Sequence, residues 1–373
     1  MSKTALIVGG AGATGQHIVR GLAARGYDVT VLHRGVHEPA YLLPYRHLHA
    51  DPHFAEPVLQ VLGRENFDVV VLTYGRIEQL AKVFAGRCAR LVSVGGIPVY
   101  PGFVEAAAQL PAGVPLLVTE EQAPGDLTRI QDDKARAFVA KMSAAERAVL
   151  DQHDKGAYRA SVFRYPRIYG ANSIVSQEWS LVRRIIDRRP FVLLPNAGAT
   201  TFSRCAAINA AHTLLLSLEC EAAGGQVFNC GDDDQFSLAQ WAEIVLDALG
   251  AQVELVGLPT TLNHVAPHFA LYGGSMFGHA LTSTAKARAL LAYRDVIPAV
   301  NAIAESARWW FNEGAAVAAG NIARDTFDYG LEDRLYQRLA GLAADFPSAA
   351  RSAPFHSYPH PKTPTTSKDH YGR

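Results

Sequence analysis

Residues 4–17 read TALIVGGAGATGQH, and this stretch decides the fold. Residues 4–8 are a short apolar run of β-forming residues, which predicts a strand. Residues 18–23 carry apolar side chains at helical spacing. Between the two lie three glycines at three-residue spacing, namely Gly9, Gly12 and Gly15. Strand, glycine turn and helix in this order are the context that a dinucleotide-binding fingerprint requires.

Each glycine has its own role in such a turn. Gly9 lets the chain turn sharply out of the strand, Gly12 lets backbone amides approach a pyrophosphate, and Gly15 lets the helix pack close to the sheet. Ala13 and Thr14 complete the loop, and the helix N-terminus presents N–H groups and the positive end of its dipole to the phosphates. We therefore expect these five residues to hold a dinucleotide; the alternative is a plain strand-to-helix turn.

Chain length, composition and charge limit the class of protein. The chain of 373 residues exceeds one average domain, and its 49% hydrophobic residues and 31 glycines indicate a globular protein with a sizeable core. Lys+Arg and Asp+Glu are equal at 35 each, which argues against general electrostatic binding of nucleic acid or a membrane surface. The four cysteines form no CxxC pair, no signal peptide precedes the first strand, and no apolar run is long enough to span a bilayer. We expect a reduced, cytoplasmic protein.

The second predicted strand, residues 28–32, ends at His33 and Arg34. An acidic residue at this position would hydrogen-bond the ribose hydroxyls of NAD, whereas an arginine can pair with the 2′-phosphate of NADP. Because His33 and Arg34 are present and a carboxylate is not, we favour NADP over NAD. The alternative is a solvated arginine in a turn.

Residues 46–51 predict a third strand, with Asp51 leaving its end near the adenine. His47, His49 and His53 resemble a metal cluster, because alternate positions of a strand share one face. However, no carboxylate or cysteine frames them with metal-site spacing. We therefore predict no metal site.

Two more buried-type strands, residues 67–72 and 90–94, continue the alternation of strands and helices. This alternation predicts an α/β fold with a doubly wound parallel sheet of the Rossmann type. Ligands of such sheets gather at the carboxyl ends of the strands. The residues that should line the cofactor cleft there are Thr73, Tyr74, Gly95 and Gly96.

The later part of the chain predicts a helix over 134–152, a strand over 158–164 that turns back over the cleft at Pro166, and a helix over 237–249 with Ser237 as its N-cap. We predict a Rossmann core in residues 1–170, completed by elements from about 200–235, a substrate-side lobe interleaved with it over 171–346, and a disordered tail over 347–373.

In this order the motifs resemble the extended short-chain dehydrogenase/reductase superfamily of the NAD-dependent epimerase/dehydratase type. The resemblance spans residues 4–312 and rests on GGAGATG at 9–15, VTVLHRG at 29–35, FDVVV at 67–71, RYPRIYG at 164–170 and VFNCG at 227–231. Arg34 and residues 177–179 are most similar to a divergent branch that contains the chloroplast stem-loop-binding proteins. The resemblance implies a nicotinamide cofactor, a small organic or sugar-derived substrate and a homodimer.

The family's chemistry uses a Tyr-x-x-x-Lys pair on a helix and a Ser or Thr after the preceding strand, which move a proton while hydride moves to or from the nicotinamide. Matched onto this chain, these positions hold Phe138, Met142 and Gly96. All three usual catalytic groups are therefore missing. Phe138 and Met142 should either pack on the core face of their helix or shape an apolar pocket beside the nicotinamide. Other candidate proton donors near strand ends are Tyr74, Ser93, Tyr100, Tyr165 and Tyr169.

Three functions are consistent with these features. The first is an NADP-dependent oxidoreductase or epimerase/dehydratase-like enzyme with a non-standard proton donor. The second is a catalytically inactive NADP-binding sensor or scaffold, which the loss of three catalytic groups favours. The third is RNA binding or cleavage, prompted only by the similarity to the chloroplast branch; zero net charge and the lack of an interleaved basic-aromatic patch speak against it. We favour the enzyme.

Overall fold

The computed structural model describes residues 3–100, 102–122, 126–173, 177–268, 278–318 and 325–345. The chain divides after Phe327 into two compact units. The tail predicted over 347–373 lies outside the described residues.

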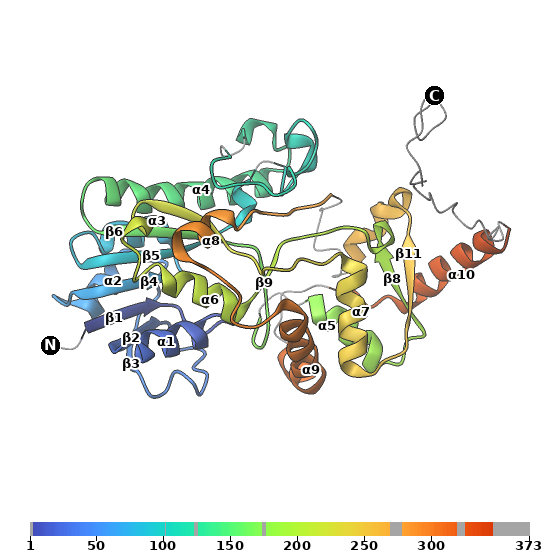
Figure 1. Ribbon diagram of the computed structural model, residues 1–373, viewed down its shortest axis with the longest axis horizontal. Coiled ribbons are helices and arrows are strands. Elements are labelled where there is room, and N and C mark those ends of the chain that lie inside the picture. The colour runs from blue at the N-terminus through green and yellow to red at the C-terminus, as the bar shows by residue number, and fades with distance from the viewer. Residues whose placement is uncertain are drawn as a thin grey trace, which may run out of the picture. The chain divides into compact units, whose positions relative to one another are not determined.

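A parallel sheet forms the centre of the first unit (Figure 1). In the described part of the chain this sheet has seven strands, in the order β10-β6-β5-β4-β1-β2-β3. They are β1 (Lys3–Val8), β2 (Tyr27–His33), β3 (Arg46–His49), β4 (Phe67–Leu72), β5 (Cys88–Gly96), β6 (Arg159–Tyr165) and β10 (Gln226–Asn229). Each neighbouring pair is parallel. The predicted doubly wound α/β fold is confirmed, and the strand order switches between β1 and β4.

Helices cover both faces of this sheet (Figure 1). Ala5 and Ile7 of β1 pack into one core cluster with α1 (Gly15–Ala24), α6 (Ala207–Leu216) and α8 (Ala285–Leu291). Leu6 and Val8 of the same strand pack into the other cluster with α2 (Ala55–Leu62), α3 (Ile77–Val83) and α4 (Asp133–Asp154). Successive side chains of a strand point to opposite faces, so the continuous apolar run of β1 is what a strand buried on both sides requires.

The remaining elements of the first unit include two short parallel sheets. One pairs β7 (Arg167–Tyr169) with β9 (Arg204–Ala206), and the other pairs β8 (Phe191–Pro195) with β11 (Glu254–Leu258). Helix α9 (Ala299–Ala318) packs against both α5 (Gln177–Ile186) and α7 (Leu238–Leu249). Short 3₁₀ helices lie at Ile97–Val99, Ala106–Ala108, Leu127–Arg129, Asn196–Gly198, Glu221–Ala223 and Thr260–His268.

The predicted start of α7 is confirmed in detail. Ser237 Oγ accepts a hydrogen bond from the backbone N–H of Gln240 (3.2 Å), and Gln240 Oε1 accepts one from the backbone N–H of Ser237 (3.0 Å). This reciprocal capping box satisfies two backbone donors that a helix N-terminus leaves without intrahelical partners. Gly250, in the left-handed conformation, ends the helix.

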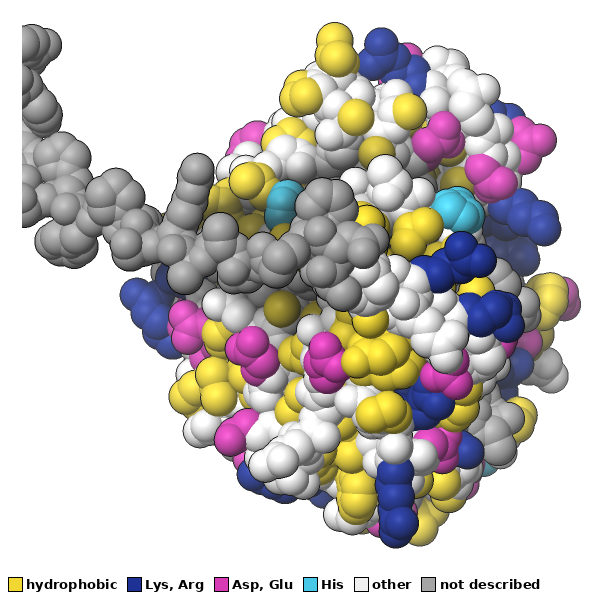
Figure 2. Space-filling model, turned by 90° about the vertical axis from the view of Figure 1, so that its right-hand side faces the viewer, with side chains coloured by type: hydrophobic (Ala, Val, Ile, Leu, Met, Phe, Trp, Pro, Cys, Tyr) yellow, Lys and Arg dark blue, Asp and Glu magenta, His cyan; other side chains and the backbone are white. Residues whose placement is uncertain are grey.

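The second unit consists, in its described residues, of α10 (Tyr329–Asp345). Asp328 Oδ1 accepts a hydrogen bond from the backbone N–H of Leu331 (2.9 Å) at the start of this helix. Among the helices described for either unit, none is both long and apolar enough to cross a membrane. Basic and acidic side chains are interspersed on the face shown in Figure 2. The chain has equal numbers of basic and acidic residues, 35 of each.

Candidate functional site

The glycine turn lies at the carboxyl end of β1, where its glycines are packed to different degrees. Gly9 has φ +101°, and a Cβ there would lie 2.5 Å from Thr73 Oγ1. A Cβ on Gly15 would lie 1.8 Å from the carbonyl O of Gly10. A Cβ on Gly12 would meet no atom within 4 Å. Gly9 and Gly15 are thus required by the fold, whereas Gly12 borders open space, which fits the close approach of a pyrophosphate.

The first turn of α1 carries nothing that would compete with a phosphate. Thr14 is the N-cap residue and makes no side-chain hydrogen bond to the helix, and the first turn holds no acidic residue. The positive end of the helix dipole therefore has no carboxylate of its own turn beside it. Such an end binds anions readily.

Two side chains hold the glycine turn in place. Thr73 Oγ1 donates a hydrogen bond to the carbonyl O of Val8 (2.9 Å) and accepts one from the N–H of Gly10 (3.3 Å). Tyr41 donates its hydroxyl to the carbonyl O of Gly10 (2.9 Å), with that of Gly12 at 3.3 Å. Burial raises the pKa of Tyr41 to about 12, so this donor keeps its proton. Sequence reasoning missed Tyr41, because it lies in the irregular segment between β2 and β3 and belongs to no motif.

Three predicted cofactor residues lie together where β2, β3 and β4 end. The Arg34 guanidinium lies over the ring of Tyr74, with 5.9 Å from Cζ to the ring centroid. The ring of His53 meets that of Tyr74 edge to face, and its Nδ1 lies 2.8 Å from Asp51 Oδ1. Hydrogen bonds from the backbone N–H and the ring of His53 lower the pKa of Asp51. The Arg34 guanidinium and the Asp51 carboxylate are both accessible to solvent at this edge of the sheet.

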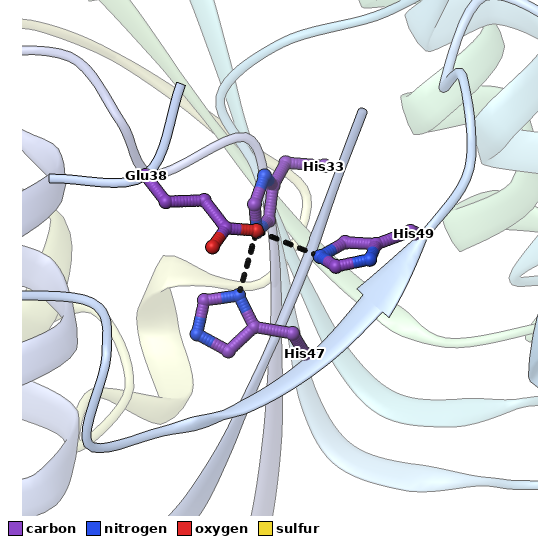
Figure 3. Close-up of side chains that lie close together, drawn as sticks. All are labelled: His33, Glu38, His47 and His49. Atoms are coloured by element: carbon purple, nitrogen blue, oxygen red, sulfur yellow. Dashed lines mark hydrogen bonds and ion pairs between the residues drawn. The ribbon is translucent and has the colours of Figure 1, made fainter. Parts of the chain in front are cut away.

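His33 takes no part in that group. Its side chain is buried and points instead toward His47, His49 and Glu38 (Figure 3). The three histidines grouped by sequence are thus separated: His53 pairs with Asp51, while the other two meet His33. A carboxylate does lie among them, which the sequence spacing gave no reason to expect.

The positions matched to the family's catalytic groups have apolar or no side chains, as the sequence states. A Cβ on Gly96 would lie 2.8 Å from Met142 Cε, so these two positions are neighbours. Phe138 is 50% exposed, and the buried residues of α4 are Val139 and Val149. The expectation that Phe138 packs on the core face of its helix is therefore wrong. The other interpretation, an apolar pocket beside the nicotinamide, stays a prediction.

Three of the five other candidate proton donors are buried. Ser93, Tyr100 and Tyr169 are each at most 3% exposed. Tyr100 donates its hydroxyl to Asn229 Oδ1 (2.6 Å), and burial raises its pKa. Burial also raises the pKa of Tyr169. These side chains hold the interior together.

Tyr169 belongs to a network around a buried carboxyl group. Asp232 accepts hydrogen bonds from the Tyr169 hydroxyl (2.7 Å), the Ala206 backbone N–H (2.9 Å) and Asn209 Nδ2 (2.8 Å). Burial raises the pKa of Asp232 to about 6, against the opposing effect of these three donors. The network connects β7, β9, α6 and the segment after β10.

Tyr74 and Tyr165 differ from the buried three. Tyr74 is 44% exposed. Tyr165, whose side chain is partly exposed, ends β6 at the edge of the core and donates its hydroxyl to the carbonyl O of Ala210 (3.5 Å). Burial of this hydroxyl raises its pKa well above the usual value. Gly95 of β5 pairs in register with Arg164 of β6, and Pro166 follows Tyr165 in the sequence. All of these lie at the carboxyl edge of the sheet, where the cofactor is predicted.

Beside this edge lies a buried ion pair that the sequence did not reveal. Arg164 donates two hydrogen bonds to Glu146, from Nη2 (2.6 Å) and Nε (3.0 Å), and its guanidinium lies 4.8 Å from the ring centroid of Tyr100. Glu120 Oε1 accepts a hydrogen bond from the backbone N–H of Asn229 (2.6 Å), and burial raises the pKa of Glu120. Glu120 thereby fixes the segment after β5 onto the end of β10.

Comparisons with known proteins agree with this geometry. Residues 5–82 match the sequence model of the NAD dependent epimerase/dehydratase family. No curated protein sequence matches the chain. Among solved structures, a UDP-galactose 4-epimerase is 16% identical, with a TM-score of 0.61 over 83% of this chain and 99% of that one.

Two further structures are similar to the same extent. A dTDP-glucose 4,6-dehydratase from Bacillus anthracis, in complex with NAD, is 13% identical with a TM-score of 0.63, over 84% of this chain and 98% of its own. A UDP-glucose 4-epimerase from Thermotoga maritima, with UDP-glucose, is 13% identical with a TM-score of 0.63, over 83% and 99%. The chain therefore shares the fold of these epimerase and dehydratase structures, and its residues 5–82 match the NAD dependent epimerase/dehydratase family.

Proposed function

We propose that this chain is an NADP-dependent enzyme of the epimerase/dehydratase type that acts on a sugar-derived or other small organic substrate. The observation that carries the proposal is the open space at Gly12 beside an α1 N-terminus without an acidic first turn. When bound, the nicotinamide would supply hydride transfer. Support for the substrate class comes from the solved structures of similar fold, whose names include a sugar-nucleotide epimerase bound to UDP-glucose.

The choice of NADP rests on the end of β2. Arg34 is exposed there. The nearby carboxylate of Asp51 already accepts hydrogen bonds from His53. A guanidinium so placed can pair with a 2′-phosphate. The Tyr74 ring beneath it keeps the guanidinium near the cleft.

Proton transfer in this proposal does not use a Tyr-x-x-x-Lys pair. Phe138 and Met142 would form an apolar wall that keeps water from the reacting atoms. Tyr74 and Tyr165 are the remaining hydroxyl candidates, because Ser93, Tyr100 and Tyr169 are buried. A group on the substrate itself is the other source of the proton.

The second candidate function is a non-catalytic NADP sensor. It is favoured by the contact between Gly96 and Met142, because this contact fills the space beside the cleft with a thioether where the family has polar groups. Both functions require the nucleotide, and they differ in whether hydride moves.

NADPH fluorescence titration tests the nucleotide site, with Gly12→Ala as the variant. The added methyl group meets no protein atom, so the thermal midpoint should stay unchanged while NADPH affinity falls at least about tenfold, or about 1.4 kcal/mol. Gly341→Ala, also in open space but in α10, is the control. Absence of NADPH binding by the native chain would overturn both functions.

Deuterium transfer then separates enzyme from sensor. Nucleotide sugars deuterated at the ring carbons are incubated with the chain and NADP⁺, and both the sugar and the cofactor are examined by mass spectrometry and NMR. An epimerase or dehydratase returns the hydride to the sugar, so a labelled sugar product of altered structure, or deuterium retained on the nicotinamide, supports the enzyme. Tight NADPH binding with neither change for any sugar of the panel supports the sensor.

A further inference from the structure

A compact group of metal-binding side chains lies at the ends of β2 and β3, and we call it the histidine cluster. Its members are His33, Glu38, His47 and His49, whose ligand atoms all lie within 4.8 Å of one another. Figure 3 shows the Glu38 carboxylate pointing between the three imidazole rings. Neither the proposed function nor the family resemblance assigns a role to this group.

The fold brings the four residues together from two strands and a loop. His33 ends β2 and pairs in register with His49 of β3, while His47 stands two positions earlier on the same face of β3. The connection between the two strands then returns Glu38 over this face. The strand register brings the histidines together and the loop brings Glu38 to them, so the spacing of these residues in the sequence does not reveal the group.

The distances between ligand atoms match those of a tetrahedral metal site. Glu38 Oε1 lies 2.9 Å from His49 Nε2, 3.7 Å from His33 Nε2 and 3.8 Å from His47 Nδ1. His33 Nε2 lies 2.7 Å from His47 Nδ1. Two ligands of a tetrahedral zinc ion, each about 2.0–2.2 Å from the metal, stand about 3.4 Å apart. The observed separations lie on either side of this value, so small side-chain shifts suffice to admit an ion.

The surroundings also suit metal binding. His47 Nε2 lies 3.0 Å from the carbonyl O of Leu42, which is the partner that orients a ligating imidazole and leaves Nδ1 for the metal. The side chain of His49 is 54% exposed and that of Glu38 is 32% exposed, so an ion can enter from solvent.

One contact must change when an ion binds. His33 Nδ1 accepts a hydrogen bond from the N–H of Gly35 (3.1 Å), so the neutral His33 ring carries its proton on Nε2, facing His47. For His33 to bind a metal through Nε2, its proton must move to Nδ1. The backbone N–H of Gly35 must then donate its hydrogen bond to a water molecule instead of to Nδ1. Gly35 is exposed, so water can replace the lost partner.

We propose that His33, Glu38, His47 and His49 bind one divalent transition-metal ion of the zinc type. Three imidazoles and one carboxylate are the ligands that Zn²⁺ and Co²⁺ accept. The ion would fasten residues 34–45 at the cluster. The same segment contacts the glycine turn through Tyr41, so the metal would hold one wall of the nucleotide site without touching the nucleotide.

Cobalt titration of the untagged, full-length chain tests the proposal. We expect one Co²⁺ per chain with the visible absorption bands of a tetrahedral site, and displacement of this ion by Zn²⁺. His49→Ala and Glu38→Gln should each weaken Co²⁺ binding by at least about tenfold, because each removes a ligand. Circular dichroism in the presence of a chelator establishes that the variants fold.

His37→Ala and His53→Ala are the matched controls. His37 lies in the same loop and His53 just after β3, but neither is in the histidine cluster. Unchanged Co²⁺ binding by both controls supports the proposal. Absence of stoichiometric binding, or an equal loss in folded His49→Ala and His37→Ala, would overturn it and leave a hydrogen-bonded histidine network. NADPH affinity is measured separately, so that failure of the nucleotide site does not affect the result.

Discussion

Met142 occupies the space that a side chain on Gly96 would need: a Cβ on Gly96 would lie 2.8 Å from Met142 Cε. The two positions are those matched to the family's Ser or Thr and its lysine. Because residue 96 has no side chain, the long apolar side chain of Met142 fills the volume that such a side chain would occupy. The residues at these two matched positions therefore form one packing arrangement.

This contact predicts a coupling between the two sites. Gly96→Ser should lower the free energy of unfolding by about 1–3 kcal/mol, because the new side chain overpacks against Met142. Adding Met142→Ala should recover part of this loss, giving a favourable coupling energy of about 1 kcal/mol in a double-mutant cycle measured by urea unfolding. Gly95→Ser is the control, because the nearest atom to its Cβ lies at an ordinary 3.7 Å. Strictly additive effects would contradict the prediction.

Arg34→Asp should reverse the preference between the two nicotinamide dinucleotides. The exposed guanidinium is replaced by a carboxylate that repels a 2′-phosphate and accepts hydrogen bonds from ribose hydroxyls. We expect NADP⁺ affinity to fall at least about tenfold while NAD⁺ affinity stays level or rises. Calorimetric titration with both cofactors measures this. Arg64→Asp, an exposed arginine in the turn after α2, should change neither affinity.

Glu146→Gln should be among the most destabilising single substitutions in the first unit. It leaves the buried Arg164 charge without its carboxylate, and breaking such a pair typically lowers stability by about 3–5 kcal/mol. Glu65→Gln breaks the pair with Arg46 on the surface, where both side chains are at least 40% exposed, and should cost less than about 1 kcal/mol. Urea unfolding of both variants compares the two losses. Similar losses would show that the Arg164 pair is not isolated from solvent.

The raised pKa of Asp232 predicts a dependence of stability on pH. Its pKa is about 6 in the folded chain against an ordinary 3.8, so the folded chain binds this proton more tightly than the unfolded chain does. The resulting stabilisation is complete below about pH 4 and is lost as the pH rises through about 6. The stability of the native chain relative to Asp232→Asn should therefore fall by up to roughly 3 kcal/mol between pH 4 and pH 7.

Urea unfolding at several pH values checks this difference. Asp247→Asn, at an exposed position of α7, should show no such change relative to the native chain. A constant difference between the native chain and Asp232→Asn across this range would show that the carboxyl stays ionised in the interior.

Local patterns predict much of the central sheet. The apolar runs of β1, β2 and β4 are buried on both faces, and three-residue glycine spacing marks the turn after β1, so sequence alone gives the fold class. The pairs β8 with β11 and β7 with β9 were missed. Their strands are short, and each finds its partner far along the chain, so only tertiary packing selects them.

The candidate site likewise contains residues that local patterns predict and residues that only tertiary packing brings together. Gly9, Gly12 and Gly15 follow from local backbone requirements. The histidine cluster does not, because His33 meets His49 through strand register and Glu38 through a loop. Exposure of Phe138 was equally hidden, since helical periodicity does not say which apolar residue of α4 faces solvent.

The position of β10 has a consequence for synthesis on the ribosome. Among the described residues it pairs only with β6. Strands β7, β8 and β9 and helix α6 lie between β6 and β10 in the sequence. When β6 has emerged, one of its edges therefore has no partner until residues 226–229 are made. An open edge of this kind is a template for pairing with other chains. Nascent chains that stop between β6 and β10 should be the ones that most need chaperones.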